Sequence, residues 1–287
     1  MESKEQPQAT PTAFKPWAML PLTPKGAANF AEASLTRLWV VQGVFALAIS
    51  LVMTWFLATA WFPQVSTSIQ HLPDTGHIDG GRLEWTNSSP QLLGENRFIS
   101  LVVDVDHEGQ ARTPSDLQVE FGATNLLILS IFGSQAVPYP PDYVFLFNGP
   151  ELVPWWGAWA PPLLVLATLA GIVVLMASWF LLATLYWVGT WVLGYFCNRD
   201  LSWGGAWRLA GAALMPAGVF QGAAILLYGL GILDLMRLLL AGALHVVVGW
   251  IFLCATILSR PRLEGLPNKA NPFTTNAPGS DAPPAAP

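Results

Sequence analysis

The sequence predicts a membrane α-helical bundle of four spans, with a small β-rich exoplasmic domain inserted between spans one and two. Composition supports this class, because 53% of the 287 residues are hydrophobic, 11% are charged and fourteen are tryptophan. A helix needs about 20 apolar residues to cross the hydrocarbon of a bilayer. Four runs without Asp, Glu, Lys or Arg reach that length, at residues 38–73, 152–198, 209–233 and 238–259.

The first span is predicted at residues 35–62 and is expected to remain in the protein. Ala58-Thr59-Ala60, near its end, has the small-residue pattern of a signal-peptide cleavage site. A signal peptide, however, has a short basic start and an apolar core of about 7 to 15 residues. Here 34 residues precede a longer core. We therefore expect an anchor, preceded by a flexible cytoplasmic tail at residues 1–34.

The second run, residues 152–198, is too long for one perpendicular span and barely long enough for two. It holds no charge and no Gly-Pro pair where a hairpin could turn, so we expect one long, tilted or bent helix. Trp155 should mark its entry into the membrane, and Pro161-Pro162 should lie in its first turn. A double crossing, which would give five spans and separate the two termini, is the alternative.

The positive-inside rule favours the single crossing, because it compares Lys and Arg near the span ends. Such residues precede the first span and follow the last: Lys15, Lys25, Arg37, Arg260, Arg262 and Lys269. Both termini are therefore predicted to be cytoplasmic, which requires an even number of spans. The remaining segments are a cytoplasmic loop at 199–207, a third span at 208–230, a fourth span at 236–259 and a flexible cytoplasmic tail at 260–287.

Residues 63–151 form the predicted exoplasmic domain. Eleven acidic residues face three basic ones in this segment, which gives it a formal charge of −8 and argues against nucleic acid as a partner. Short runs of β-branched and aromatic residues between turn signals indicate strands. We expect them at residues 82–86, 98–105, 117–121, 125–132 and 143–147, with a rigid connector at 138–141.

The stretch VVDVDHEGQ places three carboxylates and a histidine next to a glycine, in Asp104, Asp106, His107 and Glu108. Asp and Gly are typical of reverse turns, so a turn after a strand is the expected structure. A calcium loop would need a closing Glu about twelve residues along, which is missing. A metal site at these four residues, or a zinc site using His71, His77 and His107, is kept as the alternative. No cofactor is expected.

Polar residues inside the predicted spans are few. Gln221 in the third span and His245 in the fourth lie at similar depth, so we expect a hydrogen bond between them. A proton or ligand pathway is the alternative. Asp234 and Arg237 are spaced i, i+3 and should form an ion pair at the outer surface. Pro216 should bend the third helix.

The order of these parts resembles a family of bacterial membrane proteins, the domain of unknown function 1189, which is distantly related to the YIP-type membrane fold. The similar segments are HIDGGRLEW (residues 77–85), FISLVVDVDHEG (98–109) and LSWGGAWRLAGAALMPAGVF (201–220). The resemblance covers about residues 35–260. It implies a multi-span bundle with an exoplasmic β-rich insertion in the bacterial cytoplasmic (inner) membrane, and an accessory role at most.

Three classes of function remain. The expected one is a non-enzymatic scaffold, accessory or sensor subunit, embedded in the lipid bilayer, whose exoplasmic domain binds an unknown membrane or exoplasmic protein. The alternative is a small transporter or channel subunit. An enzyme is disfavoured, because the sequence has no H-E-x-x-H, no G-x-S-x-G and no P-loop.

Overall fold

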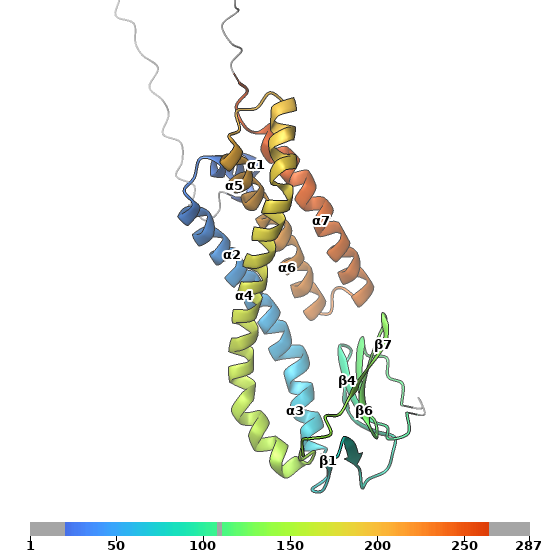
Figure 1. The fold of residues 1–287 in the computed structure, drawn as a ribbon. Coiled ribbons are helices and arrows are strands. Elements are labelled where there is room, and N and C mark those ends of the chain that lie inside the picture. Colours follow the sequence, from blue (N-terminus) through green and yellow to red (C-terminus); the bar gives the residue numbers. More distant parts are fainter. Residues whose placement is uncertain (1–20, 108–110, 264–287) are drawn as a thin grey trace, which may run out of the picture.

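The structure is a computed structural model that describes residues 21–107 and 111–263. It is mostly helical (60%), with four long apolar helices and a small β-sheet domain. Each of these helices is long and apolar enough to cross a membrane. Figure 1 shows them side by side in an elongated bundle, with the sheet domain at the end opposite the first and last described residues, 21 and 263.

The first long helix runs from residue 35 to residue 70 in three parts. They are α2 (Leu35–Phe56), a π-helical turn η3 (Leu57–Trp61) and α3 (Phe62–Gln70). Pro63 has no N–H and cannot complete a backbone hydrogen bond to residue 59, which explains the irregular turn beside it. The helix starts where the first span was predicted to start. It continues eight residues beyond the predicted end at 62, into the segment assigned to the outer domain.

The second long helix, α4 (Gly149–Phe196), is 48 residues long and has no reversal. The prediction of one long helix for residues 152–198 is therefore confirmed, and two antiparallel helices are excluded. The prediction for its first turn is wrong, because Asn148 caps the helix and Pro161-Pro162 lie about three turns further on. Figure 1 shows α4 curving over its first turns, where Pro154, Pro161 and Pro162 remove backbone donors.

The third and fourth helices form a hairpin. The third is divided into α5 (Trp203–Ala213) and α6 (Met215–Gly229) at Leu214, because Pro216 cannot donate a backbone hydrogen bond. The expected effect of Pro216 is thus an interruption of one residue, Leu214, which keeps a helical backbone, and α5 and α6 together form one candidate span at residues 203–229. Ser202 caps α5, which begins inside the predicted loop 199–207. Helix α7 (Leu235–Leu258) matches the predicted fourth span, 236–259, within one residue.

A short helical segment covers the end of the bundle where the termini lie. It consists of α1 (Pro24–Ala28) and the 3-10 turn η2 (Asn29–Ala31), and the side chain of Phe30 is fully buried in the main apolar core. The prediction of a flexible tail over residues 1–34 is therefore wrong for 24–31. The apolar Phe and Ala residues of this segment pack against α5 and α7, and the sequence pattern did not predict this contact.

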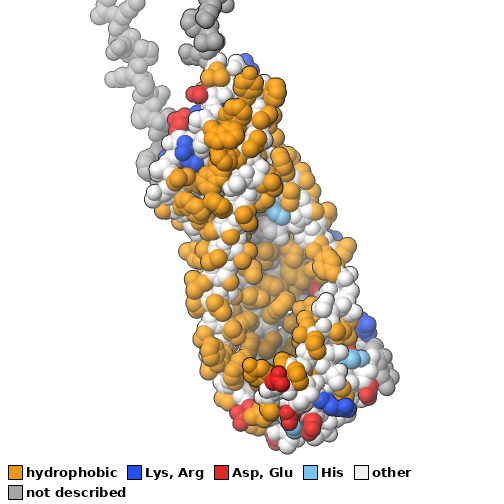
Figure 2. Space-filling view, viewed as in Figure 1, with side chains coloured by type: hydrophobic (Ala, Val, Ile, Leu, Met, Phe, Trp, Pro, Cys, Tyr) orange, Lys and Arg blue, Asp and Glu red, His pale blue; other side chains and the backbone are white. Residues whose placement is uncertain are grey.

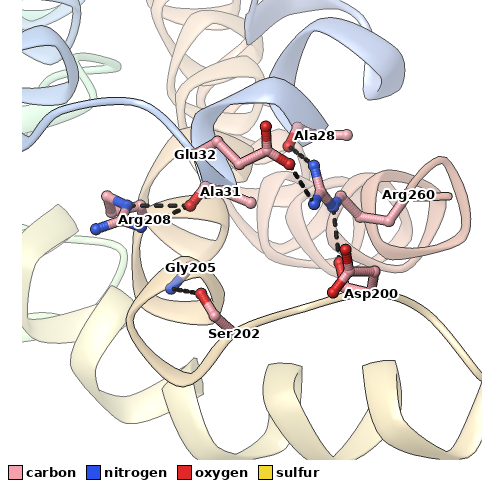
Figure 3. A network of polar contacts seen from close by, with 8 residues as sticks. All are labelled: Ala28, Ala31, Glu32, Asp200, Ser202, Gly205, Arg208 and Arg260. Atoms are coloured by element: carbon pink, nitrogen blue, oxygen red, sulfur yellow. Dashed lines mark hydrogen bonds and ion pairs between the residues drawn. The ribbon is translucent and has the colours of Figure 1, made fainter. Parts of the chain in front are cut away.

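Arginine side chains fasten this segment to the helices, as Figure 3 shows. The Arg260 guanidinium, 7% exposed, donates to the carbonyl oxygens of Ala28 and Asp200 and forms a 2.6 Å ion pair with Glu32. Arg208 makes two hydrogen bonds to the Ala31 carbonyl, at 3.2 and 2.7 Å. Five guanidinium donors in a fixed plane suit such carbonyl groups at helix ends. The tail predicted at 260–287 thus begins with a residue that is fixed.

The sheet domain contains a two-stranded ribbon, β1 (His77–Asp79) with β2 (Arg82–Glu84), and a five-stranded sheet in the order β3-β4-β5-β6-β7. The strands of the sheet are β3 (Gln91–Glu95), β4 (Ile99–Val103), β5 (Leu117–Phe121), β6 (Asn125–Ser130) and β7 (Gly133–Pro138). Neighbouring strands are antiparallel except β4 and β5.

Four of the predicted strands are confirmed as β2, β4, β5 and β6, each with the same length or shorter. The fifth, at 143–147, is wrong, because Phe145 makes only an isolated bridge to Ile78. Strands β1, β3 and β7 were not predicted. Gly and Pro interrupt β3 and end β7, which hides the alternation that identifies a strand.

Polar and aromatic contacts hold the sheet domain against the helices. Asn96 donates from Nδ2 to the Ala60 carbonyl at 2.6 Å, within the π-helical turn. Arg97 donates to the Leu233 carbonyl at 2.8 Å, in the connection between α6 and α7. The Tyr228 hydroxyl donates to the Asp116 carboxylate at 2.7 Å. The rings of Tyr228 and Phe98 pack together, with their centroids 5.0 Å apart. The domain is therefore bound to two of the long helices.

We expect Arg260→Leu to lower the free energy of unfolding by about 3 kcal/mol, because it leaves buried carbonyl groups without a donor. Thermal unfolding of the purified protein in detergent measures the effect. The control is Glu32→Gln, which removes only the ion pair and should cost less than about 1 kcal/mol, since the Glu32 side chain is 75% exposed. Equal losses would show that the ion pair, and not the carbonyl contacts, fixes Arg260.

Candidate functional site

The acidic stretch forms a turn at the end of β4, as predicted, although the turn comes two residues earlier than expected. Asp104 is 1% exposed, its N–H bonds to the Phe121 carbonyl, and the His107 N–H closes the turn on the Asp104 carbonyl at 3.3 Å. His107 has φ +52°, in the left-handed region that ends such turns. Glu108 lies outside the described residues.

His107 reaches across the sheet to two residues that the sequence analysis did not single out. Its Nδ1 lies 2.6 Å from Oε1 of Glu120, and its Nε2 lies 2.6 Å from Oδ1 of Asn125. Gly122 makes this possible, because a Cβ there would collide with the imidazole ring. The signal in the sequence was the polar Gln118 and Glu120 at alternate positions of a strand, which places both on one face.

A network of buried polar groups continues from Glu120, which is only 2% exposed. The Gln118 amide donates to Oε2 of Glu120 at 3.2 Å, and its oxygen accepts from the Thr113 N–H at 3.1 Å. Thr113 in turn shares a 2.6 Å hydrogen bond with Ser100. A buried carboxylate is costly unless it is paired and hydrogen-bonded. These hydrogen-bond partners offset the cost of burying the Glu120 carboxylate on one face of the sheet.

The surroundings of His107 change its pKa in opposite directions. Burial lowers the pKa, but the hydrogen bonds to Glu120 and Asn125 and the negative charges of Glu120 and Asp104 raise it by more, so the net pKa lies above the ordinary value. The structure thus favours the imidazolium form, which fits an ion pair between His107 and a buried carboxylate.

The described residues among the metal-site alternatives do not form a metal site. Among residues 21–107 and 111–263, no group of three or more His, Cys, Asp or Glu side chains could hold a metal ion. His71 bonds to the Leu93 carbonyl at 2.7 Å, and His77 lies 3.4 Å from Glu84 in the β1–β2 ribbon. The zinc alternative with His71, His77 and His107 is therefore wrong, because each ring has a separate partner.

Gln221 and His245 line the same cavity, but the predicted hydrogen bond between them is absent. Nδ1 of His245 bonds instead to the Gly242 carbonyl of its own helix, and Oε1 of Gln221 is buried without a hydrogen-bond partner. The prediction is wrong because a nearby backbone carbonyl satisfies the histidine. Gln42 makes the interhelical contact in this bundle, donating to the Gly211 carbonyl at 3.1 Å.

The cavity has a volume of about 530 Å³ and is bounded by α2, α4, α6 and α7. The face seen in Figure 2 is hollowed between α4 and α7. Small residues leave the space, and aromatic rings of Trp179, Tyr186 and Trp250 border it. Ser50, which is 2% exposed, lines it with an unpartnered Oγ. No Asp, Glu, Lys or Arg lines this cavity.

Asp234 and Arg237 form the predicted contact at the start of α7. Their side chains lie 3.5 Å apart, and the Asp234 carboxylate also accepts from the Arg237 backbone N–H at 2.8 Å as the cap of the helix. Both side chains are more than half exposed, so the pair contributes little stability beyond the cap.

Comparison of the chain with protein-family models, with curated proteins and with solved structures gave no match. The resemblance to the domain of unknown function 1189 therefore stays a prediction.

We expect the stability of the sheet domain to depend on pH through His107. A pKa that is higher in the folded than in the unfolded protein gives stability that is fully present below about 6.5 and is lost as the pH rises through the folded value. The thermal unfolding temperature of the full-length protein should therefore fall between pH 6 and pH 9. In His107→Gln most of this fall should disappear. An identical pH dependence in this variant would contradict the assignment.

Proposed function

We propose that the protein is a non-enzymatic scaffold, accessory or sensor subunit of a membrane, and that its outer domain binds another protein along strand β7. The observation that carries the proposal is the free edge of the sheet. All six residues of β7 are exposed, and the adjoining turn carries Ile131 and Phe132, which are 52% and 80% exposed. An unpaired edge next to exposed apolar residues is a template for an added strand.

The arrangement of apolar surface supports a position across a bilayer. Figure 2 shows hydrophobic side chains over the length of the bundle and charged side chains gathered at its two ends. Along α4, 28 residues separate Trp159 from Trp187, about 42 Å at 1.5 Å per residue. A bilayer with its headgroups measures about 40–45 Å, and tryptophan prefers its two interfaces. One crossing by α4 therefore fits its aromatic residues.

We further propose that the membrane is the bacterial cytoplasmic membrane and that both termini face the cytoplasm. Contacts of Arg260 with Ala28 and Glu32 hold the beginning and the end of the described chain at one end of the bundle. The elements at this end carry six basic residues, Lys25, Arg37, Arg199, Arg208, Arg260 and Arg262, against the acidic Glu32 and Asp200, and the acidic sheet domain lies at the other end (Figure 1). The positive-inside rule then assigns the end with the termini to the cytoplasm.

The two edges of the five-stranded sheet differ in what covers them. Edge strand β3 packs against α3, where Gly94 lies directly beside Gln64 and Ser68. Edge strand β7 has no such cover among the described residues. Opposite residues in an antiparallel pair alternate between bonded and non-bonded positions. The Tyr139 backbone N–H donates to the Thr124 carbonyl, so Tyr139 occupies a bonded position. The positions two and four residues before Pro138 are then non-bonded, like Pro138 itself, which has no N–H. The N–H groups of Ala136 and Ser134 therefore point away from β6.

The proposed partner has an extended segment with net positive charge. The outer domain carries a formal charge of −8 over residues 63–151, which attracts a basic partner and repels a second copy of the same domain. Ser134 and Ala136 would bond to the backbone of that segment, and Phe132 would contact one of its apolar side chains. This mode of binding needs no catalytic residue and no cofactor.

The contacts between the sheet domain and the helices suit a sensor. Asn96 bonds to the irregular turn of the first helix, Arg97 bonds to the α6–α7 connection, and Asp116 bonds to α6 through Tyr228. Single π-helical turns inside α-helices are frequently found at functional sites. Binding at β7 would act on helices through these three contacts.

Single cysteines test the orientation in intact cells. In a background with Cys197→Ser and Cys254→Ser, an impermeant maleimide should label Asp106→Cys but neither Trp203→Cys nor Ala270→Cys. All three should react after the cells are permeabilised. Labelling at 203 and 270 without labelling at 106 would reverse the proposed orientation, and labelling at all three in intact cells would contradict it.

Photo-crosslinking in cells tests the partner-binding edge. A benzoylphenylalanine placed at Ser134 should give one adduct with a second protein of defined mass. Ala136→Pro in the same chain should reduce the adduct at least about tenfold, because proline removes an outward N–H and keeps an extended backbone.

The matched control is Ala136→Val, which keeps the N–H and favours a strand, and should leave the adduct unchanged. An adduct with the mass of two copies of this chain would replace the proposed partner with a dimer. An adduct that survives Ala136→Pro would show that the partner does not pair with β7.

A further inference from the structure

We propose that the cavity between α2, α4, α6 and α7 binds a neutral lipid that carries a free hydroxyl group. The cavity lies within all four apolar helices and away from the contacts that hold the sheet domain. Its volume of about 530 Å³ is in the range of small-molecule sites in proteins. The inference stands apart from the proposed partner at β7, and either can fail without the other.

The walls of the cavity are shaped for a chain of carbon atoms. Small residues on three helices, such as Ala170, Gly171, Ala217 and Gly249, leave room between larger apolar side chains. Tyr186 and Trp250, with ring centroids 4.6 Å apart, bring α4 and α7 together at one end of it. In all, α4 and α7 make few contacts with each other, so a lipid chain can enter sideways between them.

Three of the polar side chains that line the cavity each carry an atom that can accept a hydrogen bond. Oε1 of Gln221 and Oγ of Ser50 are buried without a partner. His245 bonds to the Gly242 carbonyl through Nδ1, so Nδ1 carries the proton and Nε2 is an acceptor in the neutral ring. A buried acceptor without a donor costs free energy, and a ligand hydroxyl supplies the donor.

Because the walls of this cavity carry no charged residue, a neutral lipid fits better than a charged one. No Asp, Glu, Lys or Arg lines it, and a charge at this depth is expensive without a partner. A fatty acid anion or a phosphate headgroup therefore fits poorly. A monoacylglycerol or diacylglycerol provides the apolar chain and the neutral hydroxyl donor that the walls require.

Equilibrium binding of radiolabelled monooleoylglycerol to the purified full-length protein in maltoside micelles tests the proposal. One lipid should bind per chain, and methyl oleate and oleate should compete at least about tenfold less well, because neither offers a neutral hydroxyl donor. Gln221→Leu should weaken monooleoylglycerol roughly two- to tenfold and leave methyl oleate unchanged. The same variant should not lower the unfolding temperature, since it removes an unpartnered polar group.

Filling the cavity gives the second arm of the test. Ala170→Phe places a ring in the space and should abolish binding. Val173→Phe lies on the same helix with an exposed side chain outside the cavity, so it is the matched control and should bind normally. Equal affinity for monooleoylglycerol and methyl oleate would overturn the role of the hydroxyl. Undiminished binding by Ala170→Phe would overturn the site.

Discussion

Along α4, side chains such as Val165, Val173 and Leu185 are between 60% and 72% exposed, and so much apolar surface carries a large free-energy cost in water but not in hydrocarbon. This constraint governs how the helices meet. In hydrocarbon, apolar side chains gain little by leaving the solvent, so helices associate through close packing and interhelical hydrogen bonds. The structure uses both, because a side chain at Gly218 would collide with Trp179 and the hydroxyl groups of Thr54 and Thr168 bond at 2.8 Å.

Stronger polar contacts lie at the two ends of the bundle, outside this apolar zone. At the end with the termini, Arg208 and Arg260 bond to carbonyl groups of the N-terminal segment. At the other end, Arg97 bonds to the Leu233 carbonyl and packs on the rings of Phe98 and Tyr228. Guanidinium groups thus join segments far apart in sequence at both ends. Between the two ends the helices can therefore be more widely separated, and the cavity lies in this middle part of the bundle.

The sheet domain depends on the bundle as well as on its own pairing. Its β3 edge is covered by α3, so the long first helix both reaches out of the apolar zone and closes one side of the sheet. The other edge, β7, has no cover among the described residues. Inside the sheet, His107 and Gln118 bond to the carboxylate of Glu120, which would otherwise be an unpaired buried charge. The domain is therefore held by the helices at one edge and is accessible at the other.

The sequence by itself determined the four long helices, four of the strands, a turn after β4 and the ion pair of Asp234 with Arg237. These features follow from apolar run length, alternation and i, i+3 spacing, which are local. Only the tertiary structure decided that His107 meets Glu120, that Phe30 is buried and that Gln221 lacks the partner expected in His245. Such contacts depend on strand register, on the space that Gly122 leaves because it has no side chain, and on competition from nearby carbonyl groups. A pattern along one chain does not contain these distances, because they arise when separate elements pack together.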